Sequence, residues 1–421
     1  MFKFIHAADI HLDSPLRKLE RYDGAPVEEI RGATRRALLN LVQLALDEEV
    51  AFVLIAGDVY DGNWRDFKTG LFFCSEMVRL REAEIPVYLI SGNHDAANQM
   101  TKSLELPSNV KRLPSNKPAT VTLDRYGVSI HGQGFVNAAV RENLAAAYPR
   151  ATPGHFNIGL LHTSAGGSPL HEPYAPCKHD DLRSKEYDYW ALGHIHQRGV
   201  VWGDPRIQFA GNTQGRHIRE TGAKGCLVVS VDDRRSAGVR FEPLDVFRWE
   251  LVNVDASNAE SGYDVVDCVG DELRRVRADC DNRPLAVRVQ VRGASRAHES
   301  LAAEPARWTN EIRAIASDIA AGCAWIEKVK LETSPALDLD STRWAEGPLG
   351  ELSEYVAQLQ ADPADCARLA DELADLKRKL PAVLKEGDDR IDLEDPKLLV
   401  DALRHVEPML LGRLRAWRDA P

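Results

Sequence analysis

The sequence predicts an α/β fold in which several strands end in polar side chains of metal-binding types. Short apolar runs such as residues 52–56 have the length and composition of buried parallel strands, and stretches with helical periodicity stand between several of them. In open α/β sheets, functional sites form at the carboxyl ends of the strands. Gly57 ends the run at 52–56, and Asp58 follows it. Taken alone, Asp58 is more readily explained as an ordinary turn residue than as a ligand.

The same pattern of an apolar run followed by metal-type ligands recurs along the chain. The other segments are residues 2–8 followed by Asp9 and His11, residues 85–90 followed by Asn93, His94 and Asp95, residues 156–161 followed by His162, and residues 189–192 followed by His194 and His196. Each segment is a weak signal by itself. Five strand ends that carry Asp, His and Asn in this order predict one dinuclear metal site.

The helices expected between these strands follow from apolar periodicity. We expect one helix over about residues 27–49, with its apolar residues on one face, and a second over residues 67–84. Further strands are expected over residues 225–231 and 239–244, which closes a first domain at residue 245.

The remainder of the chain has a different pattern. Residues 246–345 are expected to form a small α/β accessory domain, with helices over 264–276 and 307–321 and strands over 285–291 and 325–331. Residues 346–421 are expected to form a helical tail. The predicted division is therefore 1–245, 246–345 and 346–421.

Two leucine-rich stripes mark the tail. They consist of Leu369, Leu373, Leu376, Leu380 and Leu384, and of Leu398, Leu399, Leu403, Val406, Leu410 and Leu414. A helix with one apolar face must bury it. The stripes are explained equally well by packing against the chain's own core and by a partner helix.

Composition narrows the class of protein. A length of 421 residues with 44% hydrophobic residues is enough for two or three domains with a sizeable core. The net charge of −11 argues against a generally basic nucleic-acid binder, although a local basic patch remains compatible with it. Seven scattered cysteines indicate reduced thiols and a cytoplasmic protein. We expect neither a membrane span nor a signal peptide.

The candidate ligands combine carboxylate, amide and imidazole groups. They are Asp9, His11, Asp58, Asn93, His162, His194 and His196. This mixture suits two divalent transition metals such as Mn²⁺, Fe or Zn²⁺ better than Ca²⁺. Two such metals about 3.5–4 Å apart hold both the attacking and the leaving oxygen of an in-line displacement. The predicted reaction is therefore hydrolysis of a phosphate ester.

Three further residues are candidates for roles beside the metals. His94 is placed to protonate a leaving alkoxide or to stabilise the transition state without binding a metal. Asp95 is placed to orient the His94 ring. Asp61 is placed to orient a ligand histidine, with an Asp-Gly turn as the equal alternative.

As a set, these motifs resemble the signature of the calcineurin-like metallophosphoesterases over about the first 200 residues. The resemblance implies a two-sheet sandwich flanked by helices. It assigns the ligands to one metal held by Asp9, His11 and His196, and to another held by Asn93, His162 and His194. In the same scheme Asp58 bridges the two metals, and His94 is the catalytic acid or transition-state stabiliser.

The opening stretch, residues 4–16, is similar to the SbcD and YhaO group of DNA repair exonucleases within that superfamily. The turn at residues 211–216 resembles one that this group carries after its last histidine pair. The resemblance implies a DNA exonuclease or endonuclease that uses two divalent metal ions, Mn²⁺ first, with Fe, Zn²⁺ and Mg²⁺ as alternatives. It also implies that the accessory domain shapes access for DNA, and that the tail docks on the coiled coil of an SMC-like ATPase.

Other functions remain open at this stage. One alternative is a phosphodiesterase or phosphatase for small molecules or phosphoproteins. Protein phosphatases of the superfamily usually have Asp-Arg-Gly and Asn-His-Glu motifs, whereas this chain has Asp61-Gly62-Asn63 and Asn93-His94-Asp95. An inactive scaffold subunit is a second alternative, which the complete ligand set disfavours. The oligomeric state is also open, a homodimer included.

Overall fold

The computed structural model describes most of the first 336 residues and parts of the tail. The described residues are 1–14, 30–61, 67–97, 104–166, 172–281, 283–320, 324–336, 348–361 and 372–379, with short pieces between 395 and 406. The chain divides into two compact units. The first consists of Met1–Glu250, Arg277–Val287 and Cys323–Glu327, and the second of Leu251–Val276, Arg288–Gly322 and Lys328–Pro421.

The described strands of the first unit form two six-stranded sheets. One has the order β12-β11-β1-β2-β3-β4, built from Ala237–Pro243, Gly225–Val231, Phe2–Ala7, Phe52–Ile55, Val87–Leu89 and Val110–Arg112. The other has the order β5-β6-β7-β8-β10-β9, built from Ala119–Leu123, Val128–Gln133, Phe156–His162, Tyr189–Gly193, Asp204–Phe209 and Gly199–Val201. Strands β1 to β4 run parallel, as do β6, β7, β8 and β10.

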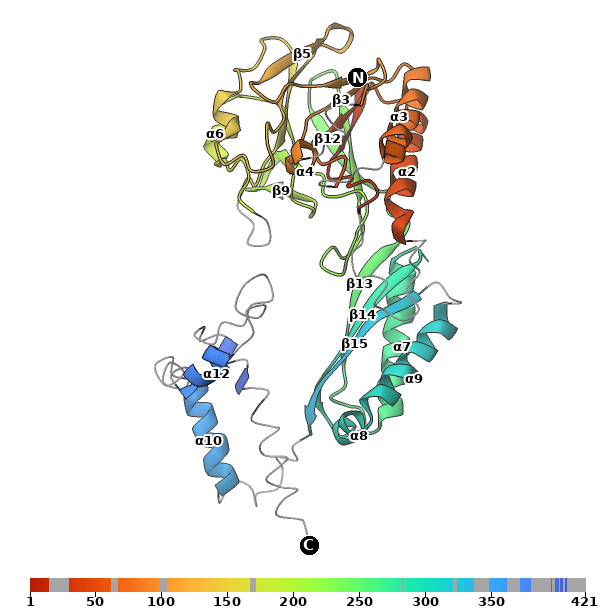
Figure 1. Cartoon of the computed structure of the whole chain (residues 1–421), viewed down its shortest axis with the longest axis vertical. Coiled ribbons are helices and arrows are strands. Elements are labelled where there is room, and N and C mark those ends of the chain that lie inside the picture. The colour runs from red at the N-terminus through yellow and green to blue at the C-terminus, as the bar shows by residue number, and fades with distance from the viewer. Residues whose placement is uncertain are drawn as a thin grey trace. The chain divides into compact units, whose positions relative to one another are not determined.

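Alternation along each strand decides what its side chains pack against. Phe4 and Phe52 point into the core between the two sheets, whereas Ile5 and Val53 pack against helices. These helices are α2 (Ala33–Asp47) and α3 (Phe67–Glu82), which lie side by side along the first sheet (Figure 1). A third cluster covers the other face of the second sheet and includes Leu182 of helix α6 (His179–Arg183). The predicted two-sheet sandwich flanked by helices is confirmed.

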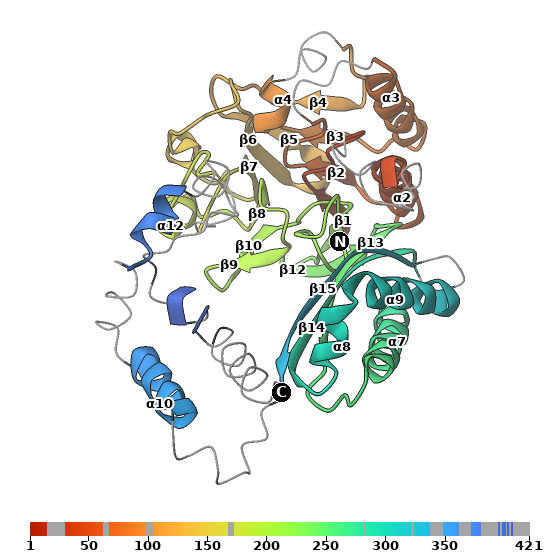
Figure 2. The same cartoon turned by 60° about the horizontal axis from the view of Figure 1, so that its bottom comes forward.

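The expected small α/β segment is also present. A three-stranded sheet has the order β13-β14-β15, with strands at Arg248–Asp255, Leu285–Ser295 and Ala324–Pro335. Helices α7 (Gly262–Asp279) and α9 (Pro305–Ala320) lie side by side next to it (Figure 2), and the short α8 spans His298–Ala303. Strand β13 was not predicted.

The tail is described only in part. Helix α10 spans Pro348–Ala361 and α12 spans Ala374–Lys379. Val356 and Leu359 of α10 are buried against Leu403. Leu403 belongs to the second leucine stripe, so part of that stripe packs within the chain. Leu376 of the first stripe is half exposed. Of the other predicted stripe residues, five lie outside the described residues, namely Leu369, Leu380, Leu384, Leu410 and Leu414. Within the described part of the chain, no helix combines the length and hydropathy needed to cross a membrane.

Packing in the core between the two sheets predicts how a substitution there changes the free energy of unfolding. Phe52 is fully buried and its ring stacks on Phe4 with centroids 4.9 Å apart. We expect Phe52→Ala to lower the free energy of unfolding by about 3–5 kcal/mol, because the cavity cannot close between two rigid sheets. Phe67 is exposed, so Phe67→Ala should change it by less than about 0.5 kcal/mol. Urea denaturation followed by circular dichroism measures both, and similar losses in the two variants would contradict the assignment of this core.

Candidate metal centre

The loops that follow β1 and β2 are joined by backbone hydrogen bonds at the candidate centre. The Asp9 amide donates to the Gly57 carbonyl at 3.1 Å, and the His11 amide donates to the Asp58 carbonyl at 3.0 Å. Asp9, His11, Asp58 and His194 all have positive φ, at 50°, 45°, 54° and 101°. Such angles are uncommon for residues with a side chain and concentrate at functional sites. The local backbone is therefore bent to bring these side chains inward.

One group of candidate ligands consists of Asp9, His11 and His196. Their ligand atoms lie within 4.8 Å of one another. The His11 and His196 Nε2 atoms are 3.1 Å apart, and the Asp9 carboxylate accepts the His194 backbone N–H at 3.0 Å. The structure thus brings together the three residues predicted for one metal.

The second group lies around His162. Its Nε2 is 3.0 Å from the Asn93 Oδ1 atom and 3.5 Å from the Asp58 Oδ2 atom. The same Asp58 oxygen is 3.8 Å from the His11 Nε2 atom. Asp58 therefore stands between the two groups, where a bridging carboxylate is expected. The His194 ring lies next to this group, with its centroid 5.2 Å from that of His162.

Oxygen acceptors behind the imidazoles define which nitrogen faces a metal. The His162 Nδ1 atom is 2.9 Å from the Ala56 carbonyl, and the His194 Nε2 atom is 2.9 Å from the Glu172 carbonyl. The His196 Nδ1 atom is 2.7 Å from the Glu220 carboxylate. A proton held at these atoms leaves the lone pair of the other ring nitrogen for a cation, which is the usual arrangement behind metal-bound histidines.

The electrostatics of the buried groups fit cations. Burial raises the pKa of Asp58 to about 7, and burial together with the nearby Asp58 charge raises the pKa of Asp9. Burial also lowers the pKa values of His11 and His162. A divalent cation stabilises the carboxylate form of the acids and binds the neutral form of the imidazoles. This donor set therefore fits two divalent metal ions.

His94 lies at the edge of the centre and is held by Asp61. The His94 Nδ1 atom is 2.8 Å from the Asp61 Oδ1 atom. Burial alone would lower the pKa of His94, but the hydrogen bond to Asp61 outweighs it and the pKa is raised. Likewise, burial would raise the pKa of Asp61, yet the nearby His11 ring, 3.7 Å away, and the hydrogen bond to His94 lower it. Asp61 thus meets the His94 Nδ1 atom and orients the His94 ring.

The orienting role predicted for Asp95 is wrong. Its carboxylate instead accepts backbone N–H groups of Val59, Tyr60 and Gly92, at 3.2, 3.0 and 3.1 Å. Asp95 lies in the short helix α4 (Asn93–Ala97), and its side chain ties the loop after β2 to the loop after β3. It supports the centre through the backbone, and Asp61 is the carboxylate that meets the His94 ring.

Sequence reasoning gave no role to Arg216 and Glu220, which lie beside the centre. Glu220 is buried, the Arg216 side chain is 12% exposed, and the Arg216 Nη2 atom is 3.0 Å from the Glu220 Oε1 atom. Burial would raise the pKa of Glu220, but the Arg216 charge and the His196 ring lower it well below the usual value. The turn at residues 211–216 was the only feature of the sequence that pointed to this segment. Its resemblance to a turn of the SbcD and YhaO group assigned no role to Arg216 or Glu220.

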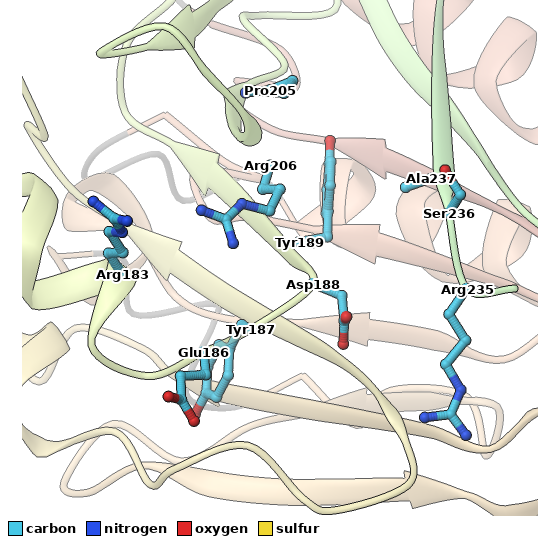
Figure 3. Close-up of a pocket in the computed structure, with 10 residues that line it drawn as sticks. All are labelled: Arg183, Glu186, Tyr187, Asp188, Tyr189, Pro205, Arg206, Arg235, Ser236 and Ala237. Carbon is cyan, nitrogen blue, oxygen red and sulfur yellow. The ribbon is translucent and has the colours of Figure 1, made fainter.

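A separate pocket lies at the opposite ends of the strands. It has a volume of about 540 Å³, and its lining includes Arg183, Asp188, Tyr189, Arg206 and Arg235 (Figure 3). Tyr189 is the first residue of β8, whereas His194 follows the last. The Arg206 guanidinium is paired with Asp204 at 2.7 Å, and Asp188 offsets further positive charge. This pocket is therefore distinct from the metal centre and has no pronounced charge of one sign.

The matches to known families cover both parts of the described chain. Residues 2–198 match the calcineurin-like phosphoesterase family, and residues 249–334 match the middle domain of the metallophosphoesterase YhaO. The uncharacterized metallophosphoesterase YhaO of Bacillus subtilis is 37% identical over 296 residues, which are 69% of this chain and 72% of that protein. The chain belongs to the calcineurin-like metallophosphoesterase family, and within it to the YhaO group.

More distant relatives match the first part of the chain. The DNA double-strand break repair protein Mre11 of Sulfurisphaera tokodaii is 32% identical over 182 residues, which are 41% of this chain and 46% of that protein. A crystal structure of a dimetal phosphatase from Danio rerio matches 57% of this chain and 99% of its own, at 12% identity and a TM-score of 0.36. A TM-score this low says nothing about function.

Family and centre together define the chemical class. The chain is a metal-dependent phosphoester hydrolase, and its fold implies a dinuclear site for divalent metals. The polar side chains gathered at the strand ends supply the ligand groups that such a site needs.

Close packing at Gly92 makes a prediction about metal binding. A Cβ atom at Gly92 would lie 2.3 Å from the Asp58 Oδ1 atom and 2.8 Å from the His162 Cε1 atom. We expect Gly92→Ala to displace both ligands and to reduce bound Mn²⁺ below two ions per chain. Gly199→Ala is the control, because no atom of the described residues lies within 4 Å of its Cβ position. Metal content by mass spectrometry after dialysis compares them; two ions retained by Gly92→Ala would argue against these ligands.

Proposed function

We propose that this protein is a DNA nuclease that uses two divalent metal ions, most readily Mn²⁺, and acts in DNA repair. The observation that carries the proposal is the similarity of the metal-centre part of the chain to Mre11, a DNA double-strand break repair protein. A second Mre11, from Sulfolobus acidocaldarius, is 25% identical over 221 residues. The position of Asp58 between the two groups of side chains supports a dinuclear site of the kind that hydrolyses phosphodiesters.

The ligand set proposed for the two metals follows the two groups of side chains. Asp9, His11 and His196 would hold one ion, and Asn93, His162 and His194 the other. When bound, the two ions supply charge compensation for the phosphate and a nucleophile at neutral pH.

His94 provides the proton that the leaving group needs. Its Nδ1 atom is fixed by Asp61, so the Nε2 atom is the donor toward the leaving oxygen. The raised pKa of His94 keeps this proton available near neutral pH. Ser14 donates a hydrogen bond to the same Asp61 carboxylate and restrains it from the other side.

The nuclease proposal is tested by substrate choice. With Mn²⁺ added, the full chain should cleave linear duplex DNA and a chromogenic phosphodiester, and EDTA should abolish both activities. His94→Ala should keep two bound metals and lose at least about a hundredfold in turnover, as expected for removal of a general acid. Metal content and initial rates are measured on the same preparation.

Two outcomes would contradict this proposal. Hydrolysis of phosphomonoesters or small diesters without DNA cleavage would favour the small-molecule alternative. Loss of metal together with activity in His94→Ala would make His94 a ligand. Phe67→Ala, on an exposed residue outside the centre, serves as the control for both measurements.

We further propose that the tail docks on the coiled coil of an SMC-like ATPase. Leu376 is 50% exposed on α12, and this helix offers an apolar side chain that the chain's own core does not bury. By contrast, Val356 and Leu359 are already buried against Leu403. The docking surface therefore starts from the first leucine stripe.

Removal of the tail after residue 345 should separate docking from chemistry. The truncated chain should keep its metals and cleave the model diester, but lose binding to an SMC-like ATPase encoded beside it, and any ATP-stimulated cutting of duplex DNA. Leu376→Glu in the full chain should weaken the same binding, because a charge then enters an apolar contact. Binding is measured by co-purification and calorimetry. If the truncated chain precipitates or Leu376→Glu binds normally, the docking proposal fails.

A further inference from the structure

Glu220 makes an unusual set of contacts for a residue outside the ligand set. It is buried, and each of its carboxylate oxygens faces donors. Oε1 is 2.7 Å from the His196 Nδ1 atom and 3.0 Å from the Arg216 Nη2 atom. Oε2 accepts from the Asn212 side-chain amide at 3.0 Å and from the Arg216 backbone N–H at 2.8 Å. No strand end supplies this residue; it lies in the segment after β10.

We propose that Glu220 is a positioning residue for the metal ligand His196, and this inference rests on the metal centre proposed above. The Arg216 Nη2 atom lies 3.2 Å from the His196 Nδ1 atom, but the Glu220 carboxylate is nearer and can only accept, so Glu220 holds the His196 proton on that nitrogen. The Nε2 lone pair is then directed toward the side chains of Asp9 and His11, which share its metal group. Partners of this kind set both the tautomer and the ring orientation of a metal-bound histidine.

Arg216 provides the counter-charge for this arrangement. Its guanidinium is 3.0 Å from Glu220 through Nη2 and 3.8 Å from the Asp61 Oδ2 atom through Nη1. A buried carboxylate without a cation is costly, so Arg216 stabilises the anion that His196 requires. The same guanidinium lies between the carboxylate that orients His196 and the one that orients His94.

A purely structural role for Glu220 has a different consequence. Its contacts to Asn212 and to the Arg216 backbone also hold the turn in place, and loss of the turn would lower stability without a specific effect on His196. The substitution Glu220→Gln, together with the His196→Ala variant, distinguishes positioning of His196 from stabilisation of the turn. Glutamine has the size of glutamate, but one of its two positions becomes an NH₂ donor. Glu220 has five hydrogen-bond contacts to described residues, and all five partners are donors when His196 holds its proton on Nδ1. Glutamine therefore opposes donor to donor at His196 in one orientation and at the turn in the other. In both orientations it removes the negative charge that holds the Nδ1 proton.

Glu220→Gln is therefore the decisive variant. The full chain is stripped with EDTA and titrated with MnCl₂ by calorimetry. We expect wild type to bind two ions, and Glu220→Gln to bind one of them about 10–100-fold more weakly while the other is unchanged. Glu186→Gln is the matched control, because Glu186 is exposed before β8 and should bind both ions as wild type does.

A double-mutant cycle separates positioning from turn stability. His196→Ala should weaken the same ion, and adding Glu220→Gln to it should cause little further loss, since Glu220 acts through His196. Thermal unfolding in EDTA reports the turn in all variants. Additive losses of affinity, or normal binding of both ions by Glu220→Gln, would overturn the proposal. Because Mn²⁺ binding is the readout, these results stand apart from the DNA assay: a wild-type chain that binds two ions and cleaves no DNA would refute only the nuclease.

Discussion

The burial of Asp9 and Asp58 beside each other is the constraint on which the rest of the centre depends. Burial removes hydration from both carboxylates and raises the pKa of each; the Asp58 charge raises the pKa of Asp9 further, and the Asp95 charge raises that of Asp58. The chain supplies imidazoles that burial keeps neutral, and neutral imidazoles do not balance the charge. Divalent cations would balance the charge of the two carboxylates. The positive φ angles of Asp9 and Asp58 and the close approach of Gly193 to the Ala56 carbonyl both hold these groups where cations would stabilise them.

Much of the fold could be predicted because each buried strand or helix has a recognisable pattern of apolar residues in the sequence. Residues 52–56 read as a buried strand, and the structure places β2 at Phe52–Ile55 with both faces covered. The order of the strands in the sheets could not be predicted, because no local pattern in the sequence indicates it. Strand β11 pairs with β1 although more than 200 residues separate them, and β10 runs parallel to β8. Such pairings depend on which distant edges meet, and hydrophobic periodicity along one segment does not contain that information.

The predictions for the centre divide in the same way. Candidate ligands that directly follow an apolar run could be located from the sequence, because a strand end fixes where its next side chains lie. Asp95 was misassigned because its neighbour in sequence is His94, whereas the start of α4 turns its carboxylate toward the amides of Val59 and Tyr60. Glu220 was missed because it follows a turn. Its position next to His196 arises only when the segment after β10 folds back on the centre, as the Asn212 N–H to His196 carbonyl contact of 3.3 Å records.

Two carboxylates beside the candidate metal centre, those of Asp61 and Glu220, make similar contacts. Asp61 orients His94, Glu220 meets His196, and both carboxylates lie within 4 Å of the Arg216 guanidinium. A rotation of Arg216 toward one anion weakens its attraction for the other, since each N–H can point at one acceptor. The His94 and His196 rings are therefore both connected to one cation through their carboxylate partners. In the roles proposed for these two histidines, the shared guanidinium links the surroundings of the proton donor to those of a metal ligand.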